Sequence, residues 1–160
     1  MKPEYIEPFI DATSSVFSMM LGCEVTRGEV SAGSQSHPDH SIMGIIGISG
    51  DVAGTLILSL RDETALCATE ALLGERPADV SDDVLDAVGE VTNMIAGSAK
   101  SQMKGVSANI SLPNVIVGSE HRIKFPSKLT PISINFDSQW GSLTIEVGLI
   151  EEAERAQVKV

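Results

Sequence analysis

The chain has 160 residues, of which 42% are hydrophobic, and a formal net charge of −11 at pH 7. This length and composition are sufficient for one domain with a sizeable core. The acidic balance argues against a nucleic-acid partner, because phosphate binding needs clustered lysine and arginine. It also disfavours anionic membrane surfaces. No apolar run approaches the roughly 18–20 residues that cross a bilayer, so the sequence predicts no membrane segment.

The two cysteines, Cys23 and Cys67, lie in apolar settings and are too few for a disulfide framework. No CxxC metal motif is present. The N-terminus, MKPEYIEPFIDA, has acidic residues where a secretory signal has a basic region and an apolar core. These features favour a cytoplasmic protein with reduced thiols.

The first part of the chain alternates between helical and extended patterns. Apolar residues at helical spacing predict a first helix over Glu4–Leu21. A weaker alternation predicts a strand over Glu24–Ala32, and turn residues predict a polar loop over Gly33–Ser41. Two apolar strands, Ile42–Ser49 and Val52–Leu60, are separated by a tight turn and therefore predict a hairpin.

A second helix is predicted over Asp62–Leu73, before a longer helix described below. After that helix the chain becomes strand-like over Val106–Val117, Glu120–Phe125, Leu129–Asp137 and Gly141–Ile150. Because strands occur in consecutive pairs, we expect an α+β fold, with a mostly antiparallel sheet and the helices packed on one face. We expect one domain over residues 1–150 and a polar C-terminal tail over 151–160.

The longest helical pattern, Ser81–Gly105, is the central helix of this predicted fold. Ser81 occupies the expected N-cap, with Asp82 and Asp83 in the first turn, where they complement the helix dipole. One side is apolar and predicted to face the core; its main residues are Leu85, Val88, Thr92, Ile95 and Ala99.

The other side of this helix carries a polar stripe. Asp86, Glu90 and Asn93 are spaced so that they stack along one face. Gly89 and Gly97 lie beside them, although an interior glycine costs roughly 1 kcal/mol relative to alanine. This pattern suggests that another molecule comes close to this face.

Three interpretations of the stripe are open from the residues alone: a solvated helix face, a di-metal carboxylate site, or a site for phosphoryl transfer. A di-metal site needs further carboxylates and histidines on facing helices, and none is visible. Phosphoryl transfer needs an oriented water and correct placement, and a carboxamide can orient water without changing protonation. The HxxH cluster His37–His40 lies in a polar loop, which makes it a poor metal site, and no nucleophile motif accompanies any serine or cysteine.

The segment Asp86-Ala-Val-Gly-Glu90-Val-Thr-Asn93 resembles the D/S-x3-E-x2-N signature of the CheC/CheX/FliY family of chemotaxis phosphatases. The similarity extends over roughly residues 5–150 and is greatest to the CheX branch, through Gly44-Ile-Ile-Gly47 and Ile110-Ser-Leu-Pro113 among other segments. Pro113 is the natural match to a proline that follows the asparagine in the family signature.

The resemblance implies a hydrolase that removes the aspartyl phosphate of a phosphorylated CheY-like response regulator. Glu90 would pair with the regulator's active-site lysine, and Asn93 would position the attacking water. Asp86 belongs to the same signature, or stabilises the helix start. The Mg²⁺ would belong to the regulator, so this chain is expected to bind no metal or cofactor of its own. The resemblance also implies a homodimer.

Two further functions remain open. The polar stripe could dock a regulator or a flagellar or other signalling partner without turnover, or the chain could be a structural dimerisation domain. In the regulator-binding interpretations, Gly89 and Gly97 are expected to remove side chains where the loops of the regulator pass the helix.

Overall fold

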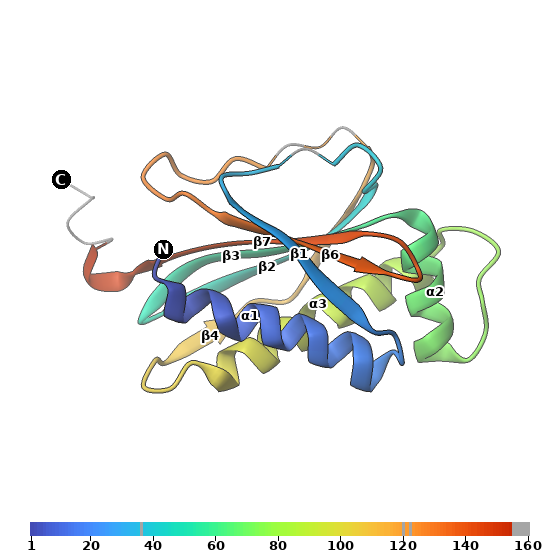
Figure 1. Ribbon diagram of the computed structural model, residues 1–160, viewed down its shortest axis with the longest axis horizontal. Coiled ribbons are helices and arrows are strands. Elements are labelled where there is room, and N and C mark those ends of the chain that lie inside the picture. The colour runs from blue at the N-terminus through green and yellow to red at the C-terminus, as the bar shows by residue number, and fades with distance from the viewer. Residues whose placement is uncertain (36, 120, 122, 155–160) are drawn as a thin grey trace.

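A computed structural model describes residues 1–35, 37–119, 121 and 123–154 (Figure 1). Helices and strands follow one another from a long N-terminal helix to a C-terminal strand. Their bounds are α1 (Pro3–Ser15), a π-helical turn η1 (Val16–Met20), β1 (Val25–Ala32), β2 (Ile42–Gly50), β3 (Val52–Leu60), α2 (Asp62–Leu73), α3 (Asp82–Gln102), β4 (Ala108–Ile110), β5 (Asn114–Val117), β6 (Ile132–Ser138) and β7 (Leu143–Glu151).

The strands form one sheet in the order β1-β6-β7-β3-β2-β4, and β5 also pairs with β2. Every pairing between these strands is antiparallel. Helices α1 and α3 lie side by side on one face of the sheet (Figure 1). The expected α+β architecture, with an antiparallel sheet covered by helices on one face, is therefore confirmed.

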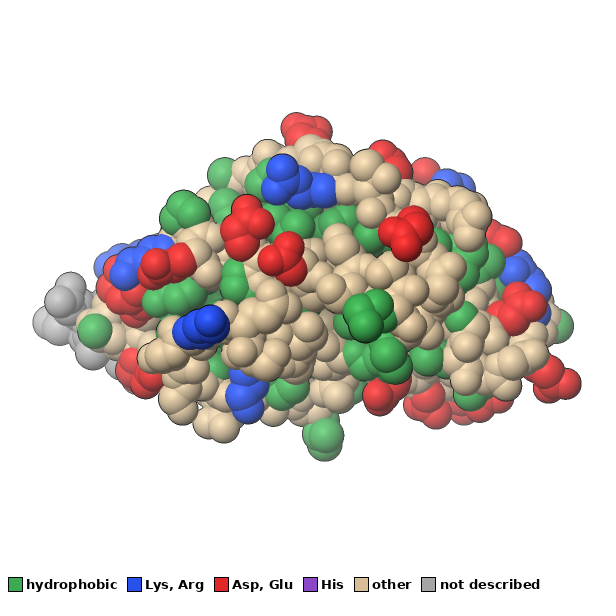
Figure 2. All heavy atoms as spheres, turned by 60° about the horizontal axis from the view of Figure 1, so that its bottom comes forward, with side chains coloured by type: hydrophobic (Ala, Val, Ile, Leu, Met, Phe, Trp, Pro, Cys, Tyr) green, Lys and Arg blue, Asp and Glu red, His purple; other side chains and the backbone are tan. Residues whose placement is uncertain are grey.

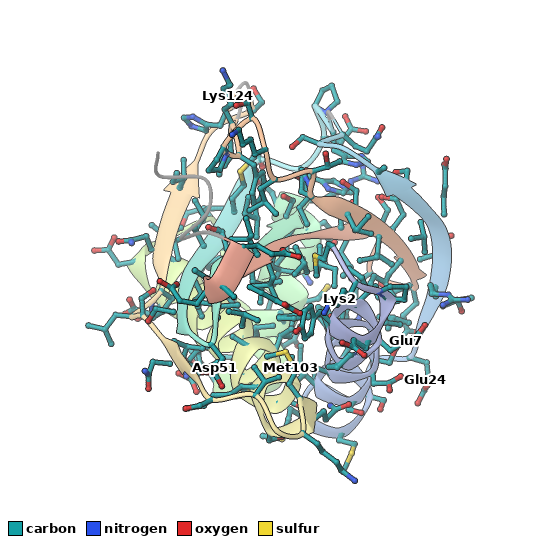
Figure 3. The ribbon with its side chains drawn as sticks, turned by 90° about the vertical axis from the view of Figure 1, so that its left-hand side faces the viewer. Lys2, Glu7, Glu24, Asp51, Met103 and Lys124 are labelled. Carbon is teal, nitrogen blue, oxygen red and sulfur yellow. The ribbon has the colours of Figure 1, made fainter. Side chains whose placement is uncertain are left out.

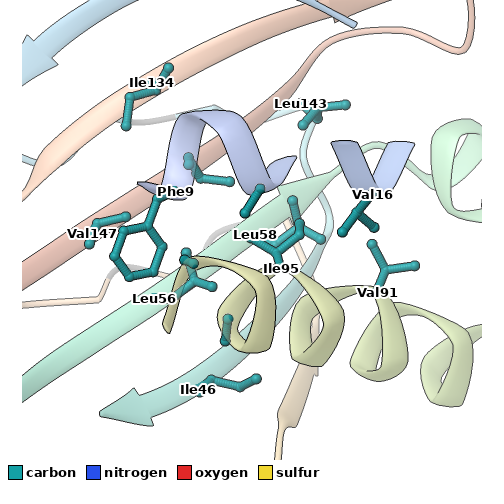
Figure 4. Packing of buried hydrophobic residues seen from close by; sticks show 14 of the residues in the cluster. Phe9, Val16, Ile46, Leu56, Leu58, Val91, Ile95, Ile134, Leu143 and Val147 are labelled. Carbon is teal, nitrogen blue, oxygen red and sulfur yellow. The ribbon is translucent and has the colours of Figure 1, made fainter. Parts of the chain in front are cut away.

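The core lies between the sheet and the two long helices. Figure 4 shows Phe9 of α1, Leu56 and Leu58 of β3, and Val91 and Ile95 of α3 converging in this layer. All five are fully buried. Each such side chain contributes roughly 1.5–3 kcal/mol relative to an exposed one, so this layer holds α3 in place.

Helix α3 approaches the sheet most closely over β2. A Cβ atom on Gly44 would lie 1.9 Å from Thr92 Oγ1 and 2.9 Å from Thr92 Cβ, so only glycine allows Thr92 to descend there. The buried Thr92 hydroxyl donates to the Val88 carbonyl at 2.7 Å and leaves no unpaired polar group at this contact.

The structure differs from the sequence-based expectation in the second half of the chain. The expected strand Val106–Val117 is divided into β4 and β5, with Ser111–Pro113 between them. The expected strand Glu120–Phe125 is wrong for its described residues, His121 and 123–125, which lie in no strand. Glu120 and Arg122 lie outside the described residues. The sheet also extends to Glu151, whose carboxylate accepts a hydrogen bond from Tyr5 at 2.8 Å.

Loop segments cover part of the sheet face that is turned away from the helices. Figure 3 shows Lys124 on this loop side and Met103, beyond the end of α3, on the helix side. The loops and the sheet border a partly open pocket of about 950 Å³ whose lining includes His40 and Glu146. The stacked rings of His37 and His40 have centroids 4.8 Å apart, and His40 Nε2 lies 3.0 Å from Ser142 Oγ.

The pKa of His40 is lowered to about 4, mainly by burial. The nearby charges of His37 and Arg61 also lower this pKa, whereas the charge of Asp39 opposes the shift. Below its usual pKa of about 6.5, His40 takes up a proton in the unfolded chain but not in the folded one. We therefore predict that its contribution to stability is complete above pH 6.5 and is lost as the pH falls toward 4.

Denaturant titrations of the wild-type protein and His40→Gln between pH 7 and 4 measure this contribution. The free energy of unfolding of His40→Gln should fall less steeply with decreasing pH than that of the wild type. His121→Gln, at an exposed histidine, should follow the wild type. Burial raises the pKa of Glu146, which gives that group the opposite pH dependence, so the difference between paired titrations is the relevant quantity. Equal slopes for wild type and His40→Gln would contradict the prediction.

Candidate functional site on helix α3

Helix α3 begins as its sequence predicts. Ser81 is the N-cap residue with extended backbone angles, and its carbonyl accepts the N–H groups of Val84 and Leu85. Its hydroxyl makes no capping hydrogen bond, so the expected side-chain cap is absent. Asp82 and Asp83 occupy the first turn, where their charges favour the positive end of the helix dipole.

The two sides of α3 separate as the 3.6-residue period requires. Val88, Val91, Thr92, Ile95 and Ala99 are buried against the sheet and α1. Asp86 and Glu90 are exposed on the other side, and Asn93 is half-buried. Figure 2, which turns the helix-covered side of the molecule forward, shows several acidic side chains on this face, with mostly uncharged, polar or backbone surface between them.

The side chains of Glu90 and Asn93 make no hydrogen bond or ion pair with any part of the chain that the structure describes. The carboxamide of Asn93 therefore keeps both its donor and its acceptor groups available. The carboxylate of Glu90, one turn earlier, is available to a cation. Residues three apart on a helix lie about 5–6 Å apart at Cβ, so one small chemical group can approach both.

Gly89 lies beside this stripe but is buried. A Cβ atom there would lie 3.4 Å from Pro113 Cγ and 3.5 Å from Val115 Cγ2. The space that the sequence analysis assigned to a partner is thus occupied by Pro113 and Val115 of the same chain. A role of Gly89 in partner binding stays a prediction. Such a role would be indirect, because Pro113 lies against the buried Gly89.

Gly97 differs from Gly89, because a Cβ atom there would meet nothing within 4 Å. It borders a shallow hollow of about 520 Å³ between the C-terminal half of α3 and β4, lined also by Lys100 and Ser107 among others. The open space beside Gly97 is compatible with the predicted close approach of another molecule.

The loop Ser111–Pro113 adds Leu112 to this site, a residue that the sequence analysis did not identify as functional, beside Pro113, which it matched to the family signature. Pro113 packs against α3 at Gly89, and Leu112 next to it is 86% exposed. The sequence signal was the proline itself, which interrupts a run that otherwise has the composition of a strand.

Other candidate sites receive less support from the structure. The described residues contain no group of three or more His, Cys, Asp or Glu side chains arranged to hold a metal ion. Cys23 is buried and Cys67 is partly buried, and the described cysteines form no disulfide. In the described part of the chain, no helix combines the length and apolar character needed to cross a membrane.

Known sequences match most of the chain. A family model described as chemotaxis phosphatase CheX matches residues 42–137, which include β2, α3 and the Ser111–Pro113 loop. The curated protein named CheY-P phosphatase CheX, from Thermotoga maritima, is 32% identical over 127 residues. That match covers 78% of this chain and 82% of the Thermotoga protein.

Comparison with solved structures agrees with the sequence matches. A CheC-like superfamily protein from Shewanella superposes with a TM-score of 0.86 at 29% identity, covering 94% of this chain and 99% of that one. The CheX-CheY-BeF3-Mg²⁺ complex from Borrelia burgdorferi matches with a TM-score of 0.73 at 29% identity, covering 92% and 98%. The chain belongs to the CheX family of chemotaxis phosphatases.

Proposed function

We propose that this protein is a hydrolase that removes the aspartyl phosphate of a phosphorylated CheY-like response regulator. Membership of the CheX family supports this activity. The Borrelia complex, which contains CheX and CheY together with BeF3 and Mg²⁺, supports a CheY-like partner. The observation that carries the proposal is the pair Glu90 and Asn93, accessible on α3 and without a partner in the described chain.

In the proposed reaction a water molecule attacks the phosphorus atom of the regulator's acyl phosphate, opposite the aspartyl oxygen. The bond between phosphorus and that oxygen breaks, leaving the aspartate carboxylate, inorganic phosphate and a released proton. The amide of Asn93 holds the attacking water in line, and it needs no change of its own protonation to do so. Helix α3 is anchored on the sheet, so the amide is placed before the regulator arrives.

The other residues of the stripe serve docking. The carboxylate of Glu90 pairs with a lysine of the regulator, because it is exposed and has no cation of its own in the described chain. Asp86 extends the acidic stripe one turn toward the start of the helix and contributes to the same surface. Gly97 leaves room for the regulator's backbone beside α3.

Three further points complete the proposal. The Mg²⁺ belongs to the regulator, which the presence of Mg²⁺ in the Borrelia complex supports. The protein works in the cytoplasm and as a homodimer, as expected from its sequence and its resemblance.

A protein that only bound the regulator would act in proportion to its concentration, whereas a phosphatase accelerates phosphate loss at substoichiometric amounts.

Asn93→Ala should reduce accelerated phosphate release about 100-fold, as loss of one catalytic hydrogen-bonding group typically does. The fold should be retained, because a partly exposed side chain without intramolecular hydrogen bonds is removed. The measurement is the rate of phosphate release from an acetyl-phosphate-treated regulator at substoichiometric phosphatase. Gln139→Ala, which removes an exposed amide from the turn between β6 and β7, is the matched control. Unchanged release by Asn93→Ala would overturn its proposed role.

Glu90→Gln should raise the regulator concentration needed for half-maximal rate about tenfold, because it removes one charge of an interfacial ion pair. The rate at saturating regulator should approach that of the wild type. Added salt should weaken the wild type more than the variant. Glu75→Gln, which removes the same charge from an exposed loop, should change none of these quantities. A rate that saturating regulator does not restore would place Glu90 in the chemical step instead.

Gly97→Ala should stabilise the isolated protein by about 0.5–1 kcal/mol, because alanine is the better helix former and its methyl group meets no neighbour. The same methyl group should raise the half-saturating regulator concentration if the regulator passes beside Gly97. Thermal unfolding and steady-state phosphate release on one preparation measure both effects. A more stable variant with wild-type saturation behaviour would remove Gly97 from the proposed interface.

A further inference from the structure

The loop beside the α3 stripe contains a β-bulge. Ile48 pairs with Ile110 of β4, and Ile45 pairs with Asn114 of β5. Between these pairs β2 has only Ile46 and Gly47, whereas the opposite strand has the three residues Ser111–Pro113. The extra residue must bend the backbone outward, and bulges of this kind turn a side chain away from the sheet. Leu112 is the residue so displaced, with 86% of its surface exposed.

The bulge is held rigidly at both of its ends. Ser111 N–H donates to the Gly47 carbonyl at 2.9 Å, and Gly47 N–H donates to Ser111 Oγ at 2.8 Å. The Ser111 hydroxyl in turn donates to the Leu112 carbonyl at 3.0 Å. On the other side, Pro113 has a restricted backbone and lies against Gly89. The backbone at Leu112 is therefore held in place before any partner binds.

This placement puts Leu112 beside the proposed site. Gly89, against which Pro113 lies, immediately precedes Glu90, and β5 contacts α3. An exposed leucine alone is unremarkable on a protein surface. An apolar side chain on a backbone held in place next to an accessible Glu90 and Asn93 is a different case, because little backbone entropy is lost when a partner buries it.

The charge of the molecule gives a reason for an apolar contact at this position. The chain has a net charge of −11, and its ionic contact with a partner at this site is the single carboxylate of Glu90, which recognises only one cation. Added salt weakens such a contact. An apolar contact adds affinity that salt screening does not control.

We propose that Leu112 is the apolar anchor for the receiver domain of the response regulator and inserts into a hydrophobic depression next to the phosphorylated aspartate. The inference rests on the proposed function and deepens it. It divides recognition between a salt-sensitive contact at Glu90 and a salt-insensitive one at Leu112, while Asn93 acts on the water.

The test compares Leu112→Ala and Leu112→Met with the wild type, using CheY-like regulators treated with acetyl phosphate. Leu112→Ala should raise the half-saturating regulator concentration about tenfold, as truncation of an anchor residue typically does. Its rate at saturation and its salt dependence should match the wild type, and Leu112→Met should restore most of the affinity. Met19→Ala, at a side chain that is 81% exposed on η1, is the matched control.

Binding to the same regulators loaded with BeF3 separates the two levels of the proposal. A wild type that binds and dephosphorylates, together with a Leu112→Ala variant of unchanged half-saturation, would overturn the anchor alone. A Leu112→Ala variant slowed only at saturation would also overturn the anchor, because the loop would then affect the chemistry. A wild type that neither binds the BeF3-loaded regulator nor accelerates phosphate release would overturn the proposed function and the anchor with it.

Discussion

The contact between Gly44 and Thr92 determines where helix α3 can lie. With any larger residue at position 44, the Thr92 side chain would collide with β2, since a Cβ atom would come within 1.9 Å of its hydroxyl oxygen. Thr92 lies between Glu90 and Asn93 in sequence. Holding Thr92 against the sheet therefore turns these two neighbours away from it, which makes the buried contact the structural reason for the exposed site.

A second close contact places the loop relative to the helix. Pro113 lies against α3 at Gly89, and the bulge that contains Pro113 is fastened to β2 through Gly47 and Ser111. Because β2 supports both the helix and the bulge, the groups that the proposal uses share one rigid support. Preorganisation of this kind matters for a catalyst that acts mainly by placing a water molecule.

The sequence predicted those features that depend on local periodicity. The two sides of α3, the bounds of α2 over Asp62–Leu73 and the β2–β3 hairpin agree with the structure, because each follows from residues close in the chain. Pro113 indicated a strand start, a bulge or an edge within Val106–Val117, but which of these it is did not follow, since it depends on how Ser111–Pro113 aligns with β2, which is distant in sequence. The neighbour of Gly89 was missed for the same reason: a glycine beside a polar stripe is compatible with a partner or with a loop of the same chain.

The proposed site separates three tasks that could conflict in one group. A charged residue that both docked the regulator and held the water would bind its partner's lysine at the expense of the water. A neutral amide at position 93 avoids this competition, and the carboxylate at position 90 leaves the chemistry unchanged. An apolar contact at Leu112 then adjusts affinity without altering the electrostatic potential at the phosphate. Regulators that share the phosphorylated aspartate and the lysine would thus be distinguished by their apolar surface, away from the reacting atoms.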